Sequence, residues 1–157
     1  MPNGKHIIIL SLALFSLYDC AGTRLSRTQK VEKIISTARS YTGTPYRMGG
    51  TSRSGIDCSG LLIQSFRSID ISIPRTSRQQ SRIGKRVQIE QLRPGDLVFF
   101  SAKKGKSKIT HAGLVTERRG DSVIRFIHSS TSRGVIEVNL LSDYYMGIFR
   151  KARRPRL

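Results

Sequence analysis

Cys58 is the residue of this sequence best placed to do chemistry. It lies in the run Gly55-Ile56-Asp57-Cys58-Ser59-Gly60-Leu61-Leu62, where a turn gives way to an apolar segment with helical spacing. A thiol at a helix N-terminus is close to unpaired backbone N–H groups and to the positive end of the helix dipole, which both favour thiolate. The placement predicts a nucleophile, and the alternative is a buried structural cysteine, because cysteine is often buried.

Two histidines could complete a thiol site. Apart from His6 near the N-terminus, the histidines are His111, which opens a predicted strand at 111–116, and His128, which closes another at 122–128. If these strands form a hairpin, both imidazoles lie at the same end of the sheet, where a packed helix could present Cys58. Nucleophile, base and a group that orients the base are the parts of an activated thiol. The alternatives are ordinary strand-end histidines or zinc ligands. No Cys-x-x-Cys or His-x-x-x-His pair supports metal, so neither a metal nor a cofactor is expected.

The elements that must position these residues follow from hydrophobic periodicity. Apolar residues at three- and four-residue steps predict helices, and short apolar runs bounded by turns predict strands. The expected helices are 27–42 and 58–69, with a short helical turn within 75–83, and the expected strands are 97–100, 111–116, 122–128, 135–139 and 145–152. Helices come first and an antiparallel sheet follows, which predicts an α+β fold in one domain.

The N-terminus has the pattern of an export signal. Lys5 precedes an apolar run, 7–17, that is too short to span a bilayer and fits a signal-peptide core. The following Leu17-Tyr18-Asp19-Cys20 resembles a bacterial lipoprotein signal in which Cys20 is lipidated, although Asp19 departs from the small residue expected there. We therefore expect a signal peptide at 1–19, a linker at 20–27 and a domain at 28–157. Export without a lipid, a buried leader helix and a Cys20–Cys58 disulfide are the alternatives.

The charge balance favours acidic partners. The chain has 28 Lys and Arg against 10 Asp and Glu, a net charge of +18 over 157 residues. Such a surface suits nucleic acid, anionic lipid or an acidic polymer. The cations are spread along the whole chain, and aromatic residues are not interleaved with them as a base-stacking surface would require. Nucleic-acid binding is therefore not expected, whereas attraction to an anionic membrane surface is.

Five motifs in order resemble the NlpC family of bacterial cell-wall cysteine peptidases. They are Thr44-Pro45-Tyr46-Arg47-Met48-Gly49-Gly50, Gly55-Ile56-Asp57-Cys58-Ser59-Gly60, Arg93-Pro94-Gly95-Asp96-Leu97-Val98-Phe99-Phe100, His111-Ala112-Gly113 and Ile127-His128-Ser129-Ser130. The resemblance covers about residues 30–152. It implies a papain-like α+β fold and hydrolysis of amide bonds in peptidoglycan stem peptides. The layout is most similar to small lipoprotein murein endopeptidases, which implies a place at the outer membrane, facing the periplasm.

The resemblance also implies roles for individual residues. Cys58 would be the nucleophile, His111 its base, and His128 the group that orients His111. The Tyr46 hydroxyl and the Cys58 backbone N–H would bind the developing oxyanion, and the alternative for Tyr46 is a packing residue. Substrate contacts are implied at Asp57, Ser59, Arg75 and Ser77. For Asp57 and Ser59 the alternative is capping of the helix.

The expected reaction is acyl transfer in two steps, with a thioester intermediate that water releases. Two other functions remain open at this point. One is a catalytically silent module that binds peptidoglycan, and the other is a thiol acyltransferase or amidase acting on another substrate.

Overall fold

A computed structural model describes residues 24–157. Three helices lie in the first half of this range: α1 (Arg27–Arg39), α2 (Cys58–Arg67) and the short α3 (Ser77–Gln80). A two-stranded hairpin, β1 (Thr51–Ser52) and β2 (Gly55–Ile56), leads directly into α2. The predicted signal peptide and Cys20 lie outside the described residues. Among those described, no helix combines the length and apolar character that a membrane crossing requires.

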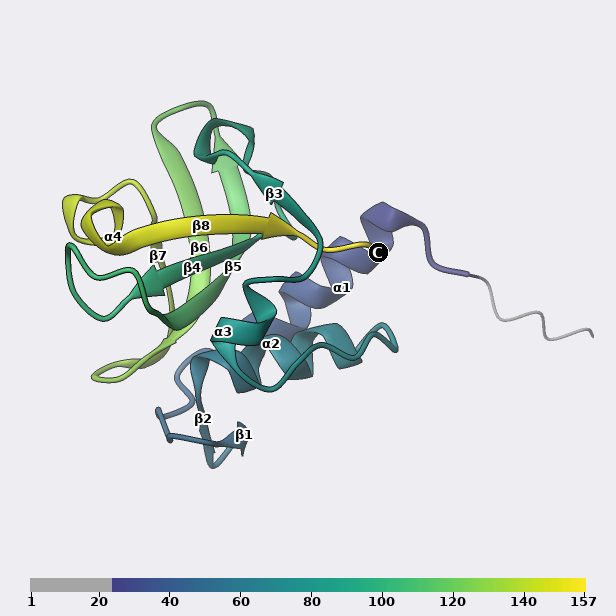
Figure 1. Cartoon of the computed structure of the whole chain (residues 1–157). Coiled ribbons are helices and arrows are strands. Elements are labelled where there is room, and N and C mark those ends of the chain that lie inside the picture. Colours follow the sequence, from purple (N-terminus) through teal and green to yellow (C-terminus); the bar gives the residue numbers. More distant parts are fainter. Residues whose placement is uncertain (1–23) are drawn as a thin grey trace, which may run out of the picture.

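The second half forms a six-stranded antiparallel sheet (Figure 1). Its spatial order is β3-β8-β4-β5-β6-β7. The strands are β3 (Lys85–Val87), β4 (Leu97–Ser101), β5 (Ile109–Arg119), β6 (Val123–Ser130), β7 (Gly134–Asn139) and β8 (Phe149–Arg154). A 3-10 turn, η1 (Ile89–Gln91), lies between β3 and β4, and α4 (Asp143–Ile148) precedes β8.

Both faces of the sheet are buried, and alternate residues along each strand divide between two cores. Leu97 and Phe99 of β4 pack with the buried residues of α1 and α2, whereas Val98 and Phe100 point to the other face. That second face is covered in part by Tyr145 and Ile148 of α4. The period-2 alternation explains why β4 is an uninterrupted apolar run in the sequence. Figure 1 shows α1, α2 and α3 gathered on one side of the sheet.

Local capping sets where the helices begin. Ser26 accepts a hydrogen bond from the Gln29 backbone N–H while the Gln29 side chain accepts one from the Ser26 N–H, a complete capping box. Asp57 caps α2 in the same position by accepting from the Gly60 N–H at 2.6 Å. The predicted α+β order of helices and antiparallel strands is confirmed, and α1 and α2 end two or three residues earlier than predicted.

The prediction of a final strand at 145–152 is wrong in its first half. Residues 143–148 form α4, and the strand begins only at Phe149. Tyr145 and Ile148 are the buried residues of α4, and their three-residue spacing puts both on one helical face. The aromatic residues favoured a strand by propensity, but burial of this one helical face against the sheet decides the local structure.

Candidate active site

Cys58 is the first residue of α2, and its side chain is buried against β5. The residue is 6% exposed. The Ala112 backbone N–H of β5 and the N–H groups of Cys58 and Ser59 are directed at the thiol and favour its charged form. Burial has a larger effect than these N–H groups, and the nearby Asp57 carboxylate acts in the same direction as burial. The pKa of Cys58 therefore rises to about 11. The expectation that the helix start favours thiolate in the resting protein is therefore wrong, because desolvation is the larger effect.

His111 and His128 are in direct contact. The β5–β6 hairpin pairs Leu114 with Ile127, which brings the start of one strand to the end of the other. His111 Nε2 lies 2.6 Å from His128 Nδ1. Burial lowers the pKa of His111 to about 4, so the imidazole is neutral at pH 7. Since Nε2 is engaged, Nδ1 is the nitrogen of His111 left to accept a proton.

Tyr145 extends this pair into a chain of three side chains. The Tyr145 hydroxyl lies 3.0 Å from His128 Nε2, and both residues are buried. The Phe126 ring stacks on His128 with centroids 5.0 Å apart. Burial, together with the charges of His111 and Arg133, lowers the pKa of His128 to about 3. Tyr145 was not predicted as a site residue, because its sequence pattern was interpreted as a strand.

The His128 contacts bear on the zinc alternative. Nδ1 of His128 faces His111, and Nε2 faces Tyr145, so both ring nitrogens already have hydrogen-bond partners. A metal ligand needs one of these lone pairs. The donor arrangement therefore does not suit a Cys58-His111-His128 metal site. Within residues 24–157, no cluster of three metal-ligating side chains is found.

Tyr46 lies on the same side of the site as the histidines. It pairs with Ile56 in an isolated bridge, which fixes the loop next to β2 and the start of α2. Burial raises the pKa of Tyr46, and the proximity of Cys58 and Asp57 raises it further, so the phenol stays neutral. Tyr46, His111 and His128 all line a cleft of about 460 Å³. A larger hollow of about 650 Å³ lies beside α1, and none of the predicted site residues lines it.

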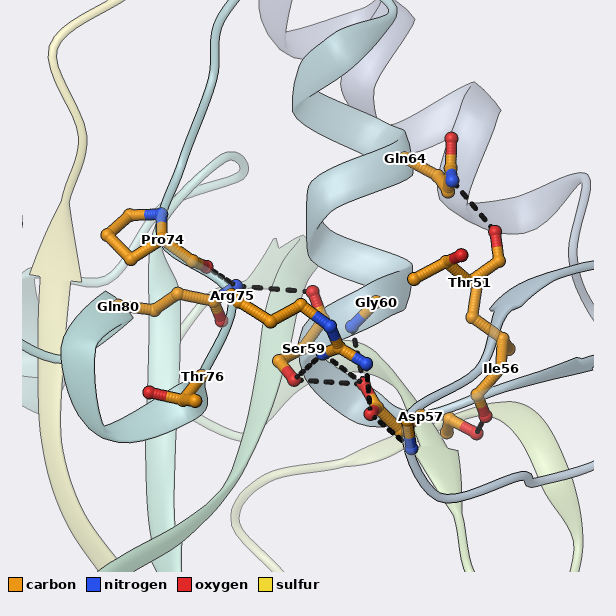
Figure 2. A network of polar contacts seen from close by, with 12 residues as sticks. Thr51, Ile56, Asp57, Ser59, Gly60, Gln64, Pro74, Arg75, Thr76 and Gln80 are labelled. Carbon is orange, nitrogen blue, oxygen red and sulfur yellow. Dashed lines mark hydrogen bonds and ion pairs between the residues drawn. The ribbon is translucent and has the colours of Figure 1, made fainter.

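The Asp57 carboxylate is the centre of a second network (Figure 2). Its Oδ1 accepts hydrogen bonds from Ser59 Oγ at 2.9 Å and Arg75 Nη1 at 3.1 Å, in addition to the Gly60 N–H. Its Oδ2 accepts from Arg75 Nη2 at 2.7 Å and from the Gly49 N–H at 2.9 Å. Burial alone would raise the pKa of Asp57, but these hydrogen bonds, that of Arg75 first, lower it overall. Asp57 thus caps the helix, which was the alternative to a substrate contact for this residue.

The four predicted substrate contacts are only partly brought together. Asp57, Ser59 and Arg75 bind one another, since Arg75 Nη1 also lies 2.8 Å from Ser59 Oγ. Ser77 is buried at the start of α3, next in the chain to the Thr76 cap. No side-chain hydrogen bond within residues 24–157 joins Ser77 to the network. The Arg75 side chain is still 41% exposed, so it faces both the carboxylate and solvent.

A close backbone approach holds the loop that carries Tyr46 against the helix. The Asp57 N–H donates to the Gly50 carbonyl at 3.1 Å. A Cβ on Gly60 would lie 2.3 Å from that same oxygen, so a larger residue at position 60 would force the loop away. This contact explains a glycine in the first turn of α2, where glycine is otherwise unfavourable.

A buried cysteine and a hydrogen-bonded histidine pair on an α+β scaffold are features shared with cysteine-type hydrolases. The NlpC/P60 family matches residues 43–154, and the chain belongs to that family. It is 41% identical over 117 residues to the probable endopeptidase NlpC of Escherichia coli (strain K12), a match that covers 74% of this chain and 72% of that protein. The murein DD-endopeptidase MepS/murein LD-carboxypeptidase of the same strain is 35% identical over 123 residues, covering 78% of this chain and 61% of that protein.

The solved structures agree with this assignment. An NlpC/P60 family protein from Bacillus cereus ATCC 10987 is similar with a TM-score of 0.70 and 37% identity, over 79% of this chain and 39% of that one. The predicted family and the papain-like α+β fold are confirmed. The chain is accordingly an enzyme of the peptidase class.

The pKa values of the site predict slow alkylation of Cys58. With a pKa of about 11, only about 10⁻⁴ of the thiol is ionised at pH 7, against roughly 3% for free cysteine. In a Cys20→Ala chain, we expect iodoacetamide to react at pH 7 about three-hundredfold more slowly than with free cysteine. The rate should rise about tenfold per pH unit towards pH 10. A plateau between pH 5 and pH 8 would instead reveal a thiolate formed in the resting protein.

Proposed function

We propose that this protein is a peptidoglycan endopeptidase that hydrolyses amide bonds in cell-wall stem peptides through Cys58. The observation that carries the proposal is the contact of His111 with His128, next to the strand residue whose N–H is directed at the Cys58 thiol. The names of the relatives, endopeptidase and murein endopeptidase, support the substrate class.

The proposed mechanism begins with a neutral pair. When a stem peptide binds, His111 Nδ1 takes the proton of the Cys58 thiol as sulfur attacks the amide carbonyl. The Tyr46 hydroxyl and the Cys58 backbone N–H stabilise the oxyanion. The His111 imidazolium then gives its proton to the leaving amine, which departs and leaves a thioester. Water attacks the thioester with His111 again as base, and the acid product leaves with the thiol restored.

His128 acts in this mechanism by selecting a tautomer of His111. A base at Nδ1 requires the proton on Nε2, where it is donated to His128 Nδ1. His128 must then carry its own proton on Nε2, and that proton is donated to the Tyr145 oxygen. Tyr145 is therefore a positioning residue in the proposal, acting through both histidines.

Removal of one oxygen tests the role of Tyr145. Tyr145→Phe keeps the ring that packs on Phe100 and Phe126 but leaves His128 Nε2 without its partner. A lost buried hydrogen bond of about 1–2 kcal/mol corresponds to a loss of roughly tenfold in kcat, with KM little changed. The matched control is Tyr41→Phe, since Tyr41 packs beside the helical core and does not line the cleft. A wild-type kcat in Tyr145→Phe would contradict the positioning role.

The substrate contacts are proposed at the edge of the Asp57 network. Arg75 is exposed enough to meet a stem-peptide carboxylate while Asp57 holds its other side. Ser59 and Ser77 are proposed to contribute polar contacts next to it. Asp57 contributes by holding Arg75 and the start of α2.

Digestion of purified sacculi tests the function as a whole. We expect the full chain to release soluble peptide fragments, and mass spectrometry of defined muropeptides then identifies which bond is cut. Binding without new fragments would favour a silent binding module. Turnover of acyl-lipid substrates alone would favour an acyltransferase or amidase.

We also propose that the protein is exported and held at the outer membrane by a lipid on Cys20, with residues 1–19 as the signal peptide. The support is the sequence pattern before Cys20 and the net charge of +18, which would add attraction to an anionic membrane. Incorporation of labelled palmitate should require Cys20. Labelling of a Cys20→Ala chain would contradict lipid attachment at Cys20.

A further inference from the structure

A second groove, at the start of β5, is lined by cations. We call it the cationic groove, and its volume is about 490 Å³. Its charged lining residues come from three segments of the chain: Arg78 and Arg82 in and after α3, Lys108 before β5, and Lys151 of β8. No carboxylate lines it.

Two further arginines surround the cationic groove. Arg86 of β3 is paired in register with Arg153 of β8, and Arg153 Nε donates to the Ser81 carbonyl at 2.8 Å. Burial lowers the pKa of Lys151, and the charges of Arg153, Arg82 and Arg86 lower it further. The last effect is the repulsion expected when like charges are held close together.

These six cations have no acidic partners within residues 24–157. Other arginines of the protein do: Arg75 binds Asp57, and Arg154 binds Asp96 at 2.7 Å. None of Arg78, Arg82, Arg86, Lys108, Lys151 and Arg153 makes an ion pair there. A concave surface of one sign focuses its field and concentrates oppositely charged groups.

The groove adjoins the active-site cleft along the chain. Lys108 and Ile109 line the groove, while Thr110 and His111, the next two residues, line the cleft. Arg78 also follows Ser77 directly. An extended ligand that crosses the start of β5 would therefore lie in both hollows.

We propose that the cationic groove binds carboxylates of stem peptides that neighbour the one being cut, so that it recognises the polymer in addition to the scissile bond. This inference rests on the proposed function, because it assumes that peptidoglycan is the substrate. A single strand bearing carboxylates fits a concave groove between α3 and β8 better than a flat bilayer does. The groove would raise the rate on intact wall material and leave the rate on a single short muropeptide unchanged.

The test compares two triple variants of the full chain. Arg78→Gln, Arg82→Gln and Lys108→Gln remove three charges at exposed groove residues, and none of these side chains makes a hydrogen bond within the described range. The control removes three charges elsewhere, by Lys30→Gln, Lys33→Gln and Arg67→Gln.

At low salt we expect the groove variant to digest sacculi about tenfold more slowly than the control. A soluble disaccharide-peptide should be cut equally by both, and salt near 0.5 M should abolish the difference on sacculi, because it screens exposed charges.

Each other outcome has a definite meaning. Equal digestion of sacculi by both variants overturns the proposal, and so does an equal loss on the soluble fragment, which would place the three cations in the active site. Loss of binding to phosphatidylglycerol vesicles with digestion of sacculi unchanged would assign the groove to lipid instead. Co-sedimentation of Cys58→Ala chains with sacculi separates this question from catalysis. If no chain cuts either substrate, the proposed function fails, whereas weaker co-sedimentation of the groove variant would still support the groove.

Discussion

Cys58→Ala is expected to lower hydrolysis of muropeptides by about 10⁴- to 10⁶-fold, the size of effect seen when a covalent nucleophile is removed. The proposed thioester cannot form without sulfur, and Cys58 is the only cysteine among residues 24–157. The fold should survive, because the change trims one buried atom at the start of α2 while the Asp57 cap remains. The measurement is product formation from a defined muropeptide, with circular dichroism as the check on folding.

Cys58→Ser provides the matched control for that result. It keeps a hydroxyl in nearly the same place, so binding of substrate should be retained, but an alcohol is a far weaker acid than a thiol and reaches its anion much less readily. We expect activity close to that of Cys58→Ala. If Cys58→Ala kept more than about 1% of the wild-type rate, Cys58 would not be the nucleophile and the covalent mechanism would have to be abandoned.

His111→Gln is expected to lower kcat/KM by about 10³-fold near pH 7, within the range that a positioned general base contributes. Glutamine can still donate a hydrogen bond towards His128 but cannot take a proton from the thiol. In the wild type, His111 has a pKa of about 4 and Cys58 one of about 11, so the neutral pair predominates between these values and kcat/KM should be flat from about pH 5 to pH 10. Below that window the imidazole becomes protonated and activity falls.

The pH profile of the variant is the decisive readout. Without the base, only the ionised thiol can attack, so the residual rate of His111→Gln should climb about tenfold per pH unit between pH 7 and pH 10. A double variant, His111→Gln with His128→Ala, should be little slower than His111→Gln alone, because His128 acts only through His111. A flat profile for His111→Gln would contradict the role of His111 as the base. Additive losses in the double variant would contradict the proposal that His128 acts through His111.

Much of this site could be expected from the sequence because local signals marked its parts. The Asp-Cys-Ser-Gly run before an apolar helical repeat located the helix start, and the strand-end positions of His111 and His128 required only that β5 and β6 form a hairpin. The hairpin is set by short-range alternation and a turn at Gly120, which are readable in one sequence.

The remaining features depend on contacts between distant segments. The raised pKa of Cys58 follows from its burial against β5, and no local sequence pattern reveals how far folding removes water from a helix start. Tyr145 lies in a helix because Tyr145 and Ile148 fit one face of the sheet, although their aromatic neighbours favour a strand. The edge strand β3 was missed because it has three residues, two of them exposed cations, so its pairing with β8 leaves no apolar alternation in the sequence.

The chain divides the site between its two halves, which affects when during folding activity can appear. Cys58 and Tyr46 precede the sheet in the chain, whereas His111, His128 and Tyr145 belong to the second half. A partly folded chain whose helices have formed before the sheet therefore has the Cys58 thiol but lacks the base proposed to activate it. The β5–β6 hairpin must dock on α2 before a proton can leave the sulfur. In the proposed mechanism, bond cutting therefore requires these long-range contacts, and a chain that lacks them cannot hydrolyse peptides prematurely.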